Sequence, residues 1–215
     1  MNASADWINA AERQYPVVID PSIVVSSGTA NGDISSTYVI QGSPNSAQTA
    51  YSTLYVGYSS LSNTKQSEIY LHVNSLPSLP KNCVLIGSKL AYFCPYSNGN
   101  GYTYTASSVS SLNLEIHELT PSTTPSNYKS WIQNLTWNTT HPNNSVIYDS
   151  TVIDYAKVSD DSENSYVLWD ITPSVQKWYA DSSSNKGLAI VPESNNYSST
   201  KAAVAVLYGY SIMVS

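Results

Sequence analysis

The segment Ser165–Pro192, SYVLWDITPSVQKWYADSSSNKGLAIVP, constrains the fold more than any other part of the chain. In its first third, Val167, Trp169 and Ile171 alternate with Tyr166, Leu168 and Asp170. A period of two places successive side chains on opposite faces of a strand, so this part predicts a strand with one buried face.

The middle of the same segment predicts a helix of a single turn. Thr172 is expected to be its N-cap, and Pro173 suits the first helical position, where a missing N–H costs nothing. Val175 and Trp178 lie three residues apart and therefore share one face, which we expect to pack on the core. After a polar loop, Leu188–Val191 resumes extended structure, which makes the whole segment a folding signature without a reactive group.

Short apolar or alternating segments recur along the chain, with glycine, proline and asparagine turn signals between them. The clearest are Val17–Val25, Tyr38–Ile40, Leu54–Tyr58, Ile69–Val73, Val84–Phe93, Leu112–Leu119, Val146–Val158 and Ala202–Val214. They predict an all-β fold, an antiparallel β-sandwich (jelly roll) with one or two short helices. The last of them is nearly continuously apolar, so we expect a central strand there. We expect residues 1–14 to be an N-terminal helical lead-in and residues 15–215 to form a single β-sandwich domain.

The charge of the chain narrows the classes of partner. The formal net charge is −6, with nine basic residues among 215. Nucleic acids and anionic membrane surfaces need clusters of Lys and Arg, so neither is an expected partner. No apolar run is long enough to span a membrane. Hydroxyl and amide side chains dominate the polar residues, which is more typical of extracellular modules than of cytosolic enzymes.

The two cysteines, Cys83 and Cys94, are expected to be free thiols. In one strand they lie roughly 36 Å apart, at ~3.3 Å per residue, whereas a disulfide allows about 7 Å between Cα atoms. A hairpin that turns at Gly87–Ser88 places Cys83 opposite Tyr92 and also misses the pairing.

Catalytic patterns are missing from the sequence. His72, His117 and His141 stand in no Ser/His/Asp, HExxH or CxxC context, and there is no glycine-rich phosphate loop. By alternation, His72 and His117 fall on the faces of their strands that point away from the core. We therefore expect surface or cross-strand histidines, and a protein that is not an enzyme.

Six sequence motifs, in the same order along the chain, carry a resemblance to a family. They are Tyr15–Ile23 (YPVVIDPSI), Asp33…Thr37-Tyr38-Val39, Leu54-Tyr55-Val56-Gly57, Leu76–Pro80 (LPSLP) with Ile86…Lys89-Leu90-Ala91-Tyr92, Trp131…Leu135-Thr136-Trp137-Asn138, and Trp169-Asp170-Ile171-Thr172…Leu188. Together they resemble the DNRLRE domain of bacterial wall-associated and YD/RHS-repeat polypeptides, which is associated with carbohydrate-binding module family 96. The resemblance runs from Tyr15 to the C-terminus. It implies a jelly roll and, as function, carbohydrate binding.

Aromatic rings and amides near a loop tip are the candidate ligand-binding residues, because the C–H face of a sugar ring packs on an aromatic ring. Tyr96, Tyr102 and Tyr104 flank a tip that contains Asn98 and Asn100. Tyr51, Tyr58 and Tyr197 are further candidates at loop ends. Ordinary surface packing is the alternative for each tyrosine. Trp137, Trp169 and Trp178 are expected in the core.

Calcium is the one cofactor that the sequence leaves open. Asp160, Asp161 and Glu163 lie in a Ser/Asn-rich loop, and Ca²⁺ takes carboxylate and carbonyl oxygens. Simple solvation of the loop is the alternative. An internal Lys–Asn isopeptide bond also stays open, because no residue pattern singles one out.

These observations favour a non-catalytic extracellular module that binds carbohydrate or takes part in surface adhesion. We expect a monomer, secreted or at the cell wall, with any secretion signal in sequence outside this chain. Its partner is expected to be a neutral or weakly charged glycan or cell-surface polysaccharide. The alternative is a structural spacer that packs against other domains of the parent polypeptide and has no ligand of its own.

Overall fold

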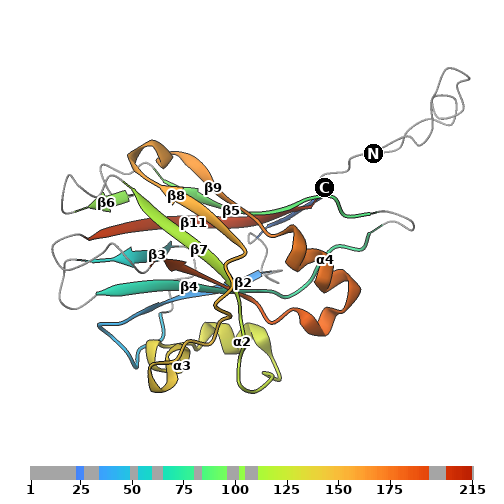
Figure 1. The fold of residues 1–215 in the computed structure, drawn as a ribbon, viewed down its shortest axis with the longest axis horizontal. Coiled ribbons are helices and arrows are strands. Elements are labelled where there is room, and N and C mark those ends of the chain that lie inside the picture. Colours follow the sequence, from blue (N-terminus) through green and yellow to red (C-terminus); the bar gives the residue numbers. More distant parts are fainter. Residues whose placement is uncertain are drawn as a thin grey trace, which may run out of the picture.

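The structure is a computed structural model (Figure 1), which describes residues 23–26, 34–48, 53–59, 65–79, 84–95, 102–104, 111–193 and 202–214. Only the backbone is described in 23–26, 102–104, 210–211 and 213–214. The expected helix in residues 1–14 and Cys83 therefore lie outside the described residues.

Eleven antiparallel strands make up the β-structure of the described chain. They are β1 (Ile23–Ser26), β2 (Ile34–Ile40), β3 (Thr53–Tyr58), β4 (Gln66–Val73), β5 (Ser88–Cys94), β6 (Tyr102–Tyr104), β7 (Leu112–Glu118), β8 (Asp154–Val158), β9 (Ser165–Asp170), β10 (Leu188–Pro192) and β11 (Ala203–Val214). Their main order is β8-β7-β10-β4-β3-β11-β5-β9, with β2 paired to β4, and β1 and β6 paired to β11. This confirms the predicted all-β, antiparallel, jelly-roll-like fold.

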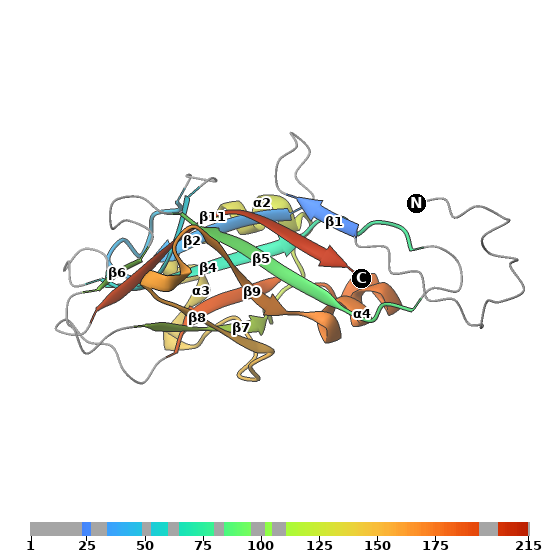
Figure 2. The ribbon, with the colours of Figure 1, turned by 90° about the horizontal axis from the view of Figure 1, so that it is seen from above.

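The sheet folds back on itself around one main core. Strands β8 and β9, at the two ends of the order, lie beside each other, and the Asp170 amide donates to Asp154 Oδ2 at 2.7 Å. The half that contains β7, β10 and β4 thus faces the half that contains β11, β5 and β9 (Figures 1 and 2). Leu71, Ile116 and Leu188 from the first half and Leu90 and Trp169 from the second belong to one buried cluster.

Strand β11 is the central strand, as its apolar sequence predicts. Along one edge it pairs with β6 and then with β5, and along the other with β3 and then with β1. Its register along β5 shifts between Tyr208 and Tyr210. Ala205, Leu207 and Ile212 face the main core.

The alternation predicted in the segment Ser165–Pro192 is confirmed. Val167, Trp169 and Ile171 are buried, and so are Val175 and Trp178 on helix α4 (Thr172–Ala180). The predicted cap is wrong. Thr172 is already the first residue of the helix, its N-cap residue is Ile171, and no side chain caps it by a hydrogen bond. Thr172 Oγ1 instead accepts the Ser88 amide of β5 at 2.8 Å. The helix spans nine residues rather than a single turn, because Trp178 anchors its second turn in the core.

Two glycines allow backbone segments to approach closely at the edges of the core. Gly57 has φ +130° and Gly187 has φ +98°. A Cβ at Gly57 would lie 2.3 Å from the Ala203 carbonyl oxygen, and a Cβ at Gly187 2.4 Å from that of Leu71. An L-residue is therefore excluded at both positions by backbone angle and by space.

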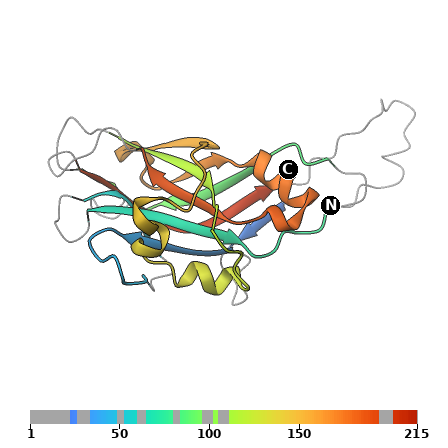
Figure 3. The same ribbon diagram turned by 60° about the horizontal axis from the view of Figure 1, so that its bottom comes forward.

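A helical layer covers the outer side of β2, β4 and β10 (Figure 3). It consists of α2 (Tyr128–Gln133), α3 (Trp137–Thr140) and the 3₁₀ turn η1 (Pro142–Asn144). These helices were not predicted. Apolar side chains of the layer and the sheet form a second buried cluster: Val39, Tyr70, Leu119, Ile132, Leu135, Ile147, Ala189 and Val191. Trp137, expected in the core, is partly buried and packs at the border of this cluster.

Two expected strands begin later than predicted. Val84 and Ile86, assigned to a strand from 84, lie exposed ahead of β5. The strand predicted from Val146 begins only at Asp154, with an isolated bridge between Leu119 and Tyr148 before it. Cys94 ends β5 as a buried thiol, and burial raises its pKa to about 11. No helix of the described chain is long and apolar enough to cross a membrane.

Candidate functional site

A row of aromatic side chains crosses the outer face of the second half of the sheet. Tyr208 on β11 pairs with Phe93 on β5, and Phe93 pairs with Tyr166 on β9. Residues paired in register share a face, so the three rings lie side by side across strands that Figure 2 shows next to one another. We call Tyr208, Phe93 and Tyr166 the aromatic row.

The aromatic row is open to solvent. The exposed fraction is 62% for Tyr166 and 37% for Tyr208, and Phe93 is half-buried between them. The Phe93 and Tyr166 rings meet edge to face with centroids 5.5 Å apart. Leu168, two residues along β9 on the same face, is 39% exposed. Large exposed apolar side chains gathered on one face are typical of an interaction surface.

Two charged residues lie on this face next to Leu168, at the end of β5 and β9 away from the row. Lys89 on β5 pairs with Asp170 on β9, and both are exposed. Asp170 Oδ1 also accepts the Thr172 amide. Hydrogen bonding from the Thr172 hydroxyl, followed by that from its amide, lowers the pKa of the Asp170 carboxyl group. The row itself is uncharged, which suits a neutral ligand.

The opposite outer face contains all three histidines, and each packs on an aromatic ring of the helical layer or its flanking segments. His72 stacks on Tyr128 with ring centroids 4.3 Å apart, and His141 stacks on Trp137 at 3.9 Å. His117 lies 5.0 Å from Tyr148. The prediction that His72 and His117 point away from the main core is correct, but the expectation of surface positions is wrong, because the helical layer and the segment after it bury both rings.

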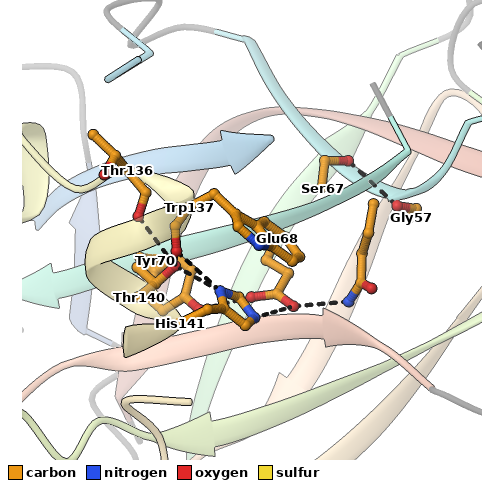
Figure 4. Close-up of polar contacts among 9 residues, drawn as sticks. Gly57, Ser67, Glu68, Tyr70, Thr136, Trp137, Thr140 and His141 are labelled. Carbon is orange, nitrogen blue, oxygen red and sulfur yellow. Dashed lines mark hydrogen bonds and ion pairs between the residues drawn. The ribbon is translucent and has the colours of Figure 1, made fainter. Parts of the chain in front are cut away.

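A buried carboxylate, Glu68, ties the helical layer to the sheet (Figure 4). It is 0% exposed on β4 and accepts hydrogen bonds from Tyr70 Oη at 2.6 Å and from Gln66 Nε2 at 2.8 Å. His141 Nε2, at the C-cap of α3, lies 3.5 Å from Glu68 Oε1. Burial, followed by the charge of Glu68, raises the pKa of Tyr70 well above its usual range. The phenol therefore stays protonated and donates to the carboxylate.

Thr140, His141 and Glu68 together have the order of a hydroxyl–imidazole–carboxylate relay. Thr140 Oγ1 lies 2.9 Å from His141 Nδ1. However, Thr140 is 0% exposed, and its hydroxyl also lies 3.0 Å from the Trp137 carbonyl oxygen, one helical turn back. A buried hydroxyl that bonds its own helix cannot reach a substrate, so we assign this group a structural role.

His117, on β7, likewise connects the sheet to a segment outside it. Its Nδ1 lies 2.9 Å from the Asp149 carbonyl oxygen, and its Nε2 lies 3.2 Å from Glu115 Oε2. The contact with Asp149 holds the segment after η1 against β7, and Glu115 lies on β7 itself. The histidines thus attach the outer segments to the sheet.

A pH-dependent stability is expected from His72. Burial lowers its pKa from the ordinary value of 6.5, so the native state holds the neutral ring. The unfolded chain then binds more protons below pH 6.5, and stability decreases as the pH falls through this range, by at most about 1.4 kcal/mol per pH unit for one proton. Urea unfolding between about pH 8 and pH 5 should show this loss, and His72→Gln should reduce it. An equally steep loss in the variant would assign the effect to other groups.

Most of the predicted ligand-binding residues lie outside the described part of the chain. Tyr96, Asn98 and Asn100 do, and so do Tyr51 and Tyr197. Tyr102 and Tyr104 belong to β6, whose backbone pairs Tyr102 with Ala205 and Tyr104 with Ala203. Tyr58, at the end of β3, is half-buried.

The predicted calcium ligands lie in and just after the 3₁₀ turn η2 (Asp160–Ser162). Among the described residues, no three acidic, histidine or cysteine side chains gather closely enough to hold a metal ion. Asp160, Asp161 and Glu163 are thus not brought together as a metal site.

The aromatic row was not predicted from the sequence. The alternation in the correctly predicted strand did place Tyr166 on the outward face, and this was the one indication of the row in the sequence. Its neighbours Phe93 and Tyr208 are 73 and 42 residues away in sequence, so the row depends on a strand pairing that alternation alone does not reveal.

The chain matches no model of a known protein family, and no curated protein matches it.

Proposed function

We propose that this protein is a non-catalytic, extracellular carbohydrate-binding module and that a neutral polysaccharide chain lies along the aromatic row. The observation that carries the proposal is the register of Tyr208, Phe93 and Tyr166, which places three rings on one outer face of the sheet. Strands are about 4.8 Å apart, so the row extends over ~10 Å and offers successive rings to successive sugar residues. The C–H faces of sugar rings pack on such aromatic surfaces.

The chemistry of the face supports a neutral ligand. The row contains no charge, and the formal net charge of −6 opposes strongly polyanionic chains. The buried state of Thr140 and Glu68 supports the non-catalytic part of the proposal.

Affinity electrophoresis in gels that contain plant, host or bacterial polysaccharides tests the proposal. At least one neutral polysaccharide is expected to retard the protein. Tyr166→Ala should weaken this binding at least roughly tenfold, the equivalent of about 1.4 kcal/mol. Val146→Ala is the matched control, because it truncates an apolar side chain that is 39% exposed beside the helical layer, away from the row. It should bind like the wild type.

Two results would contradict the proposal. Lack of retardation by every polysaccharide would favour the alternative, in which the exposed face packs against another domain of a larger polypeptide. Equal binding by the wild type and Tyr166→Ala would place the glycan site elsewhere.

A further inference from the structure

A connection without a fully buried side chain joins the end of β7 to the middle of α2. It comprises Pro121–Trp131, and we call it the strap. Leu119 before the strap and Ile132 after it are buried, and both belong to the second cluster under the helical layer. The hydrogen bonds described for the strap stay within α2 and its caps, such as the one from the Trp131 amide to the Asn127 carbonyl oxygen. The strap is therefore anchored at its two ends.

An aromatic contact attaches the middle of the strap to the sheet. Tyr128 stacks on His72 of β4, with ring centroids 4.3 Å apart and an angle of 8° between the ring planes. Tyr128 Oη is buried and has no hydrogen-bond partner within the described chain. The closed strap therefore keeps this hydroxyl group from water without replacing the lost hydrogen bonds, which favours opening.

The strap is also one wall of a groove of about 580 Å³ at the end of the sandwich. Thr124 and Tyr128 line the groove from the strap, and His72 lines it from β4. The other walls are the segment that leaves β4, which Figure 1 shows beside α4, and the end of α4 with the following turn η3 (Ser182–Ser184). Movement of the strap away from the sheet would expose His72 to water and widen this groove.

His72 differs from the other two histidines in what surrounds it. His117 Nε2 lies 3.2 Å from a carboxylate oxygen of Glu115, and His141 Nε2 lies 3.5 Å from one of Glu68. No carboxylate of the described chain forms an ion pair with His72. A proton on His117 or His141 thus meets a negative charge, whereas a proton on His72 creates a buried charge without a counterion.

The elements packed against His72 present neutral groups to its ring. The ring nitrogens lie 3.0 Å from Asn74 Oδ1 and 3.4 Å from the Asn185 carbonyl oxygen, and Ser35 is the residue paired with His72 on β2. The phenol of Tyr128 stays protonated, because burial raises its pKa. Burial is the main cause that lowers the pKa of His72, and it outweighs the effect of the two acceptors, which acts in the opposite direction.

Charged groups on the neighbouring segments interact with groups other than His72. On β4, Glu68 accepts a hydrogen bond from the Tyr70 hydroxyl group at 2.6 Å. On the connection between α4 and β10, Asp181 and Lys186 attract each other. Protonated His72 would therefore gain no ion pair from either segment.

We propose that the stack of His72 on Tyr128 is an acid-sensitive latch, which holds the strap closed at neutral pH and releases it when His72 binds a proton. The neutral ring suits the buried position, whereas the imidazolium is hydrated only when the strap opens. The attraction between the cation and the Tyr128 ring offsets a part of this difference. The movement is local, because the strap opens between Leu119 and Ile132 while the main core stays folded. It does not depend on the aromatic row.

Hydrogen exchange measured by mass spectrometry tests the latch. The amides of Ser130 and Trp131 donate to the cap residue Asn127, so their exchange reports the opening of the strap. After correction for the chemical exchange rate, their protection should fall by up to about 30-fold between about pH 7.5 and about pH 5, the limit for one proton and an ordinary histidine pKa of about 6.5 in the open state. Amides of β4 and β10 should stay more protected than these at both pH values.

Two variants and a control identify the group responsible. His72→Gln keeps a hydrogen-bonding side chain that stays neutral, so the protection of the strap should change less than about 3-fold over the same pH range. His117→Gln, the matched control, removes a histidine that contacts Tyr148 rather than the strap, and should retain the full pH dependence. Tyr128→Phe keeps the stack without the buried hydroxyl group and should reduce the opening about 3- to 10-fold at both pH values.

Three results would overturn the latch. An equal pH dependence in the wild type and His72→Gln would assign the effect to another group. Exchange of the strap at the same rate as β4 and β10 would mean that it opens only when the whole domain unfolds. Unchanged or faster exchange in Tyr128→Phe would contradict the cost of the closed position, and this test stands even if His72→Gln does not fold.

Discussion

Trp169→Ala is expected to lower the free energy of unfolding by about 3–5 kcal/mol, the cost of truncating a fully buried large side chain. Trp169 is the largest of the fully buried side chains in the described core. Its ring meets Tyr92 edge to face at 6.2 Å, and its indole N–H donates to the Leu114 carbonyl oxygen at 3.3 Å. The substitution leaves a cavity and removes the hydrogen bond to the Leu114 carbonyl oxygen. Urea unfolding followed by circular dichroism measures the loss.

Tyr166→Ala, on the same strand, is the matched control for Trp169→Ala. Its side chain is exposed, so the free energy of unfolding should change by no more than about 0.5 kcal/mol. A similar loss for both variants would mean that the two faces of β9 are equally buried, against the alternation described for this strand. The same control establishes that Tyr166→Ala is folded when its polysaccharide binding is measured.

Glu68→Ala is expected to lower the free energy of unfolding by about 3–5 kcal/mol, because the removal of one member of a buried polar group leaves the others without a partner. Tyr70 Oη and Gln66 Nε2 would lose their acceptor, and His141 would lose its link to the sheet. The helical layer should loosen more than the main core. Hydrogen exchange should therefore increase first in the amides of α2 and α3.

Glu68→Gln is the informative comparison, since it keeps the size of the side chain and removes its charge. Its amide oxygen can still accept from Tyr70, but its NH₂ group faces donors, so a loss of about 1–3 kcal/mol is expected. If the free energy of unfolding of Glu68→Ala were within about 1 kcal/mol of the wild-type value, the carboxylate would not be the anchor of the helical layer.

The sequence predicts those parts of the fold that depend on local alternation. The inward positions of Val167, Trp169 and Ile171, and the central place of the last strand, follow from residue periodicity and are confirmed. The helical layer could not be predicted in this way. Its longest helix, α2, has six residues, and these helices are stabilised by contacts with the outer face of the sheet rather than by their own sequence.

The candidate sites were less predictable, because each depends on residues brought together from distant parts of the chain. His72 and Tyr128 are 56 residues apart in sequence yet stack directly, and Asn185 joins them from a third segment. Alternation correctly gave the direction in which His72 points. It carried no information on what would cover that side of the strand.

The position of β11 has a consequence for the order of folding during synthesis. Four strands, β1, β3, β5 and β6, each pair along one edge with this strand, and the ribosome adds it after all of them. Until it emerges, those strands have unpaired edges, which favour association with other chains. The nascent chain should therefore remain sensitive to protease up to the addition of Ala203–Val214, and become resistant in a single step once this strand is available.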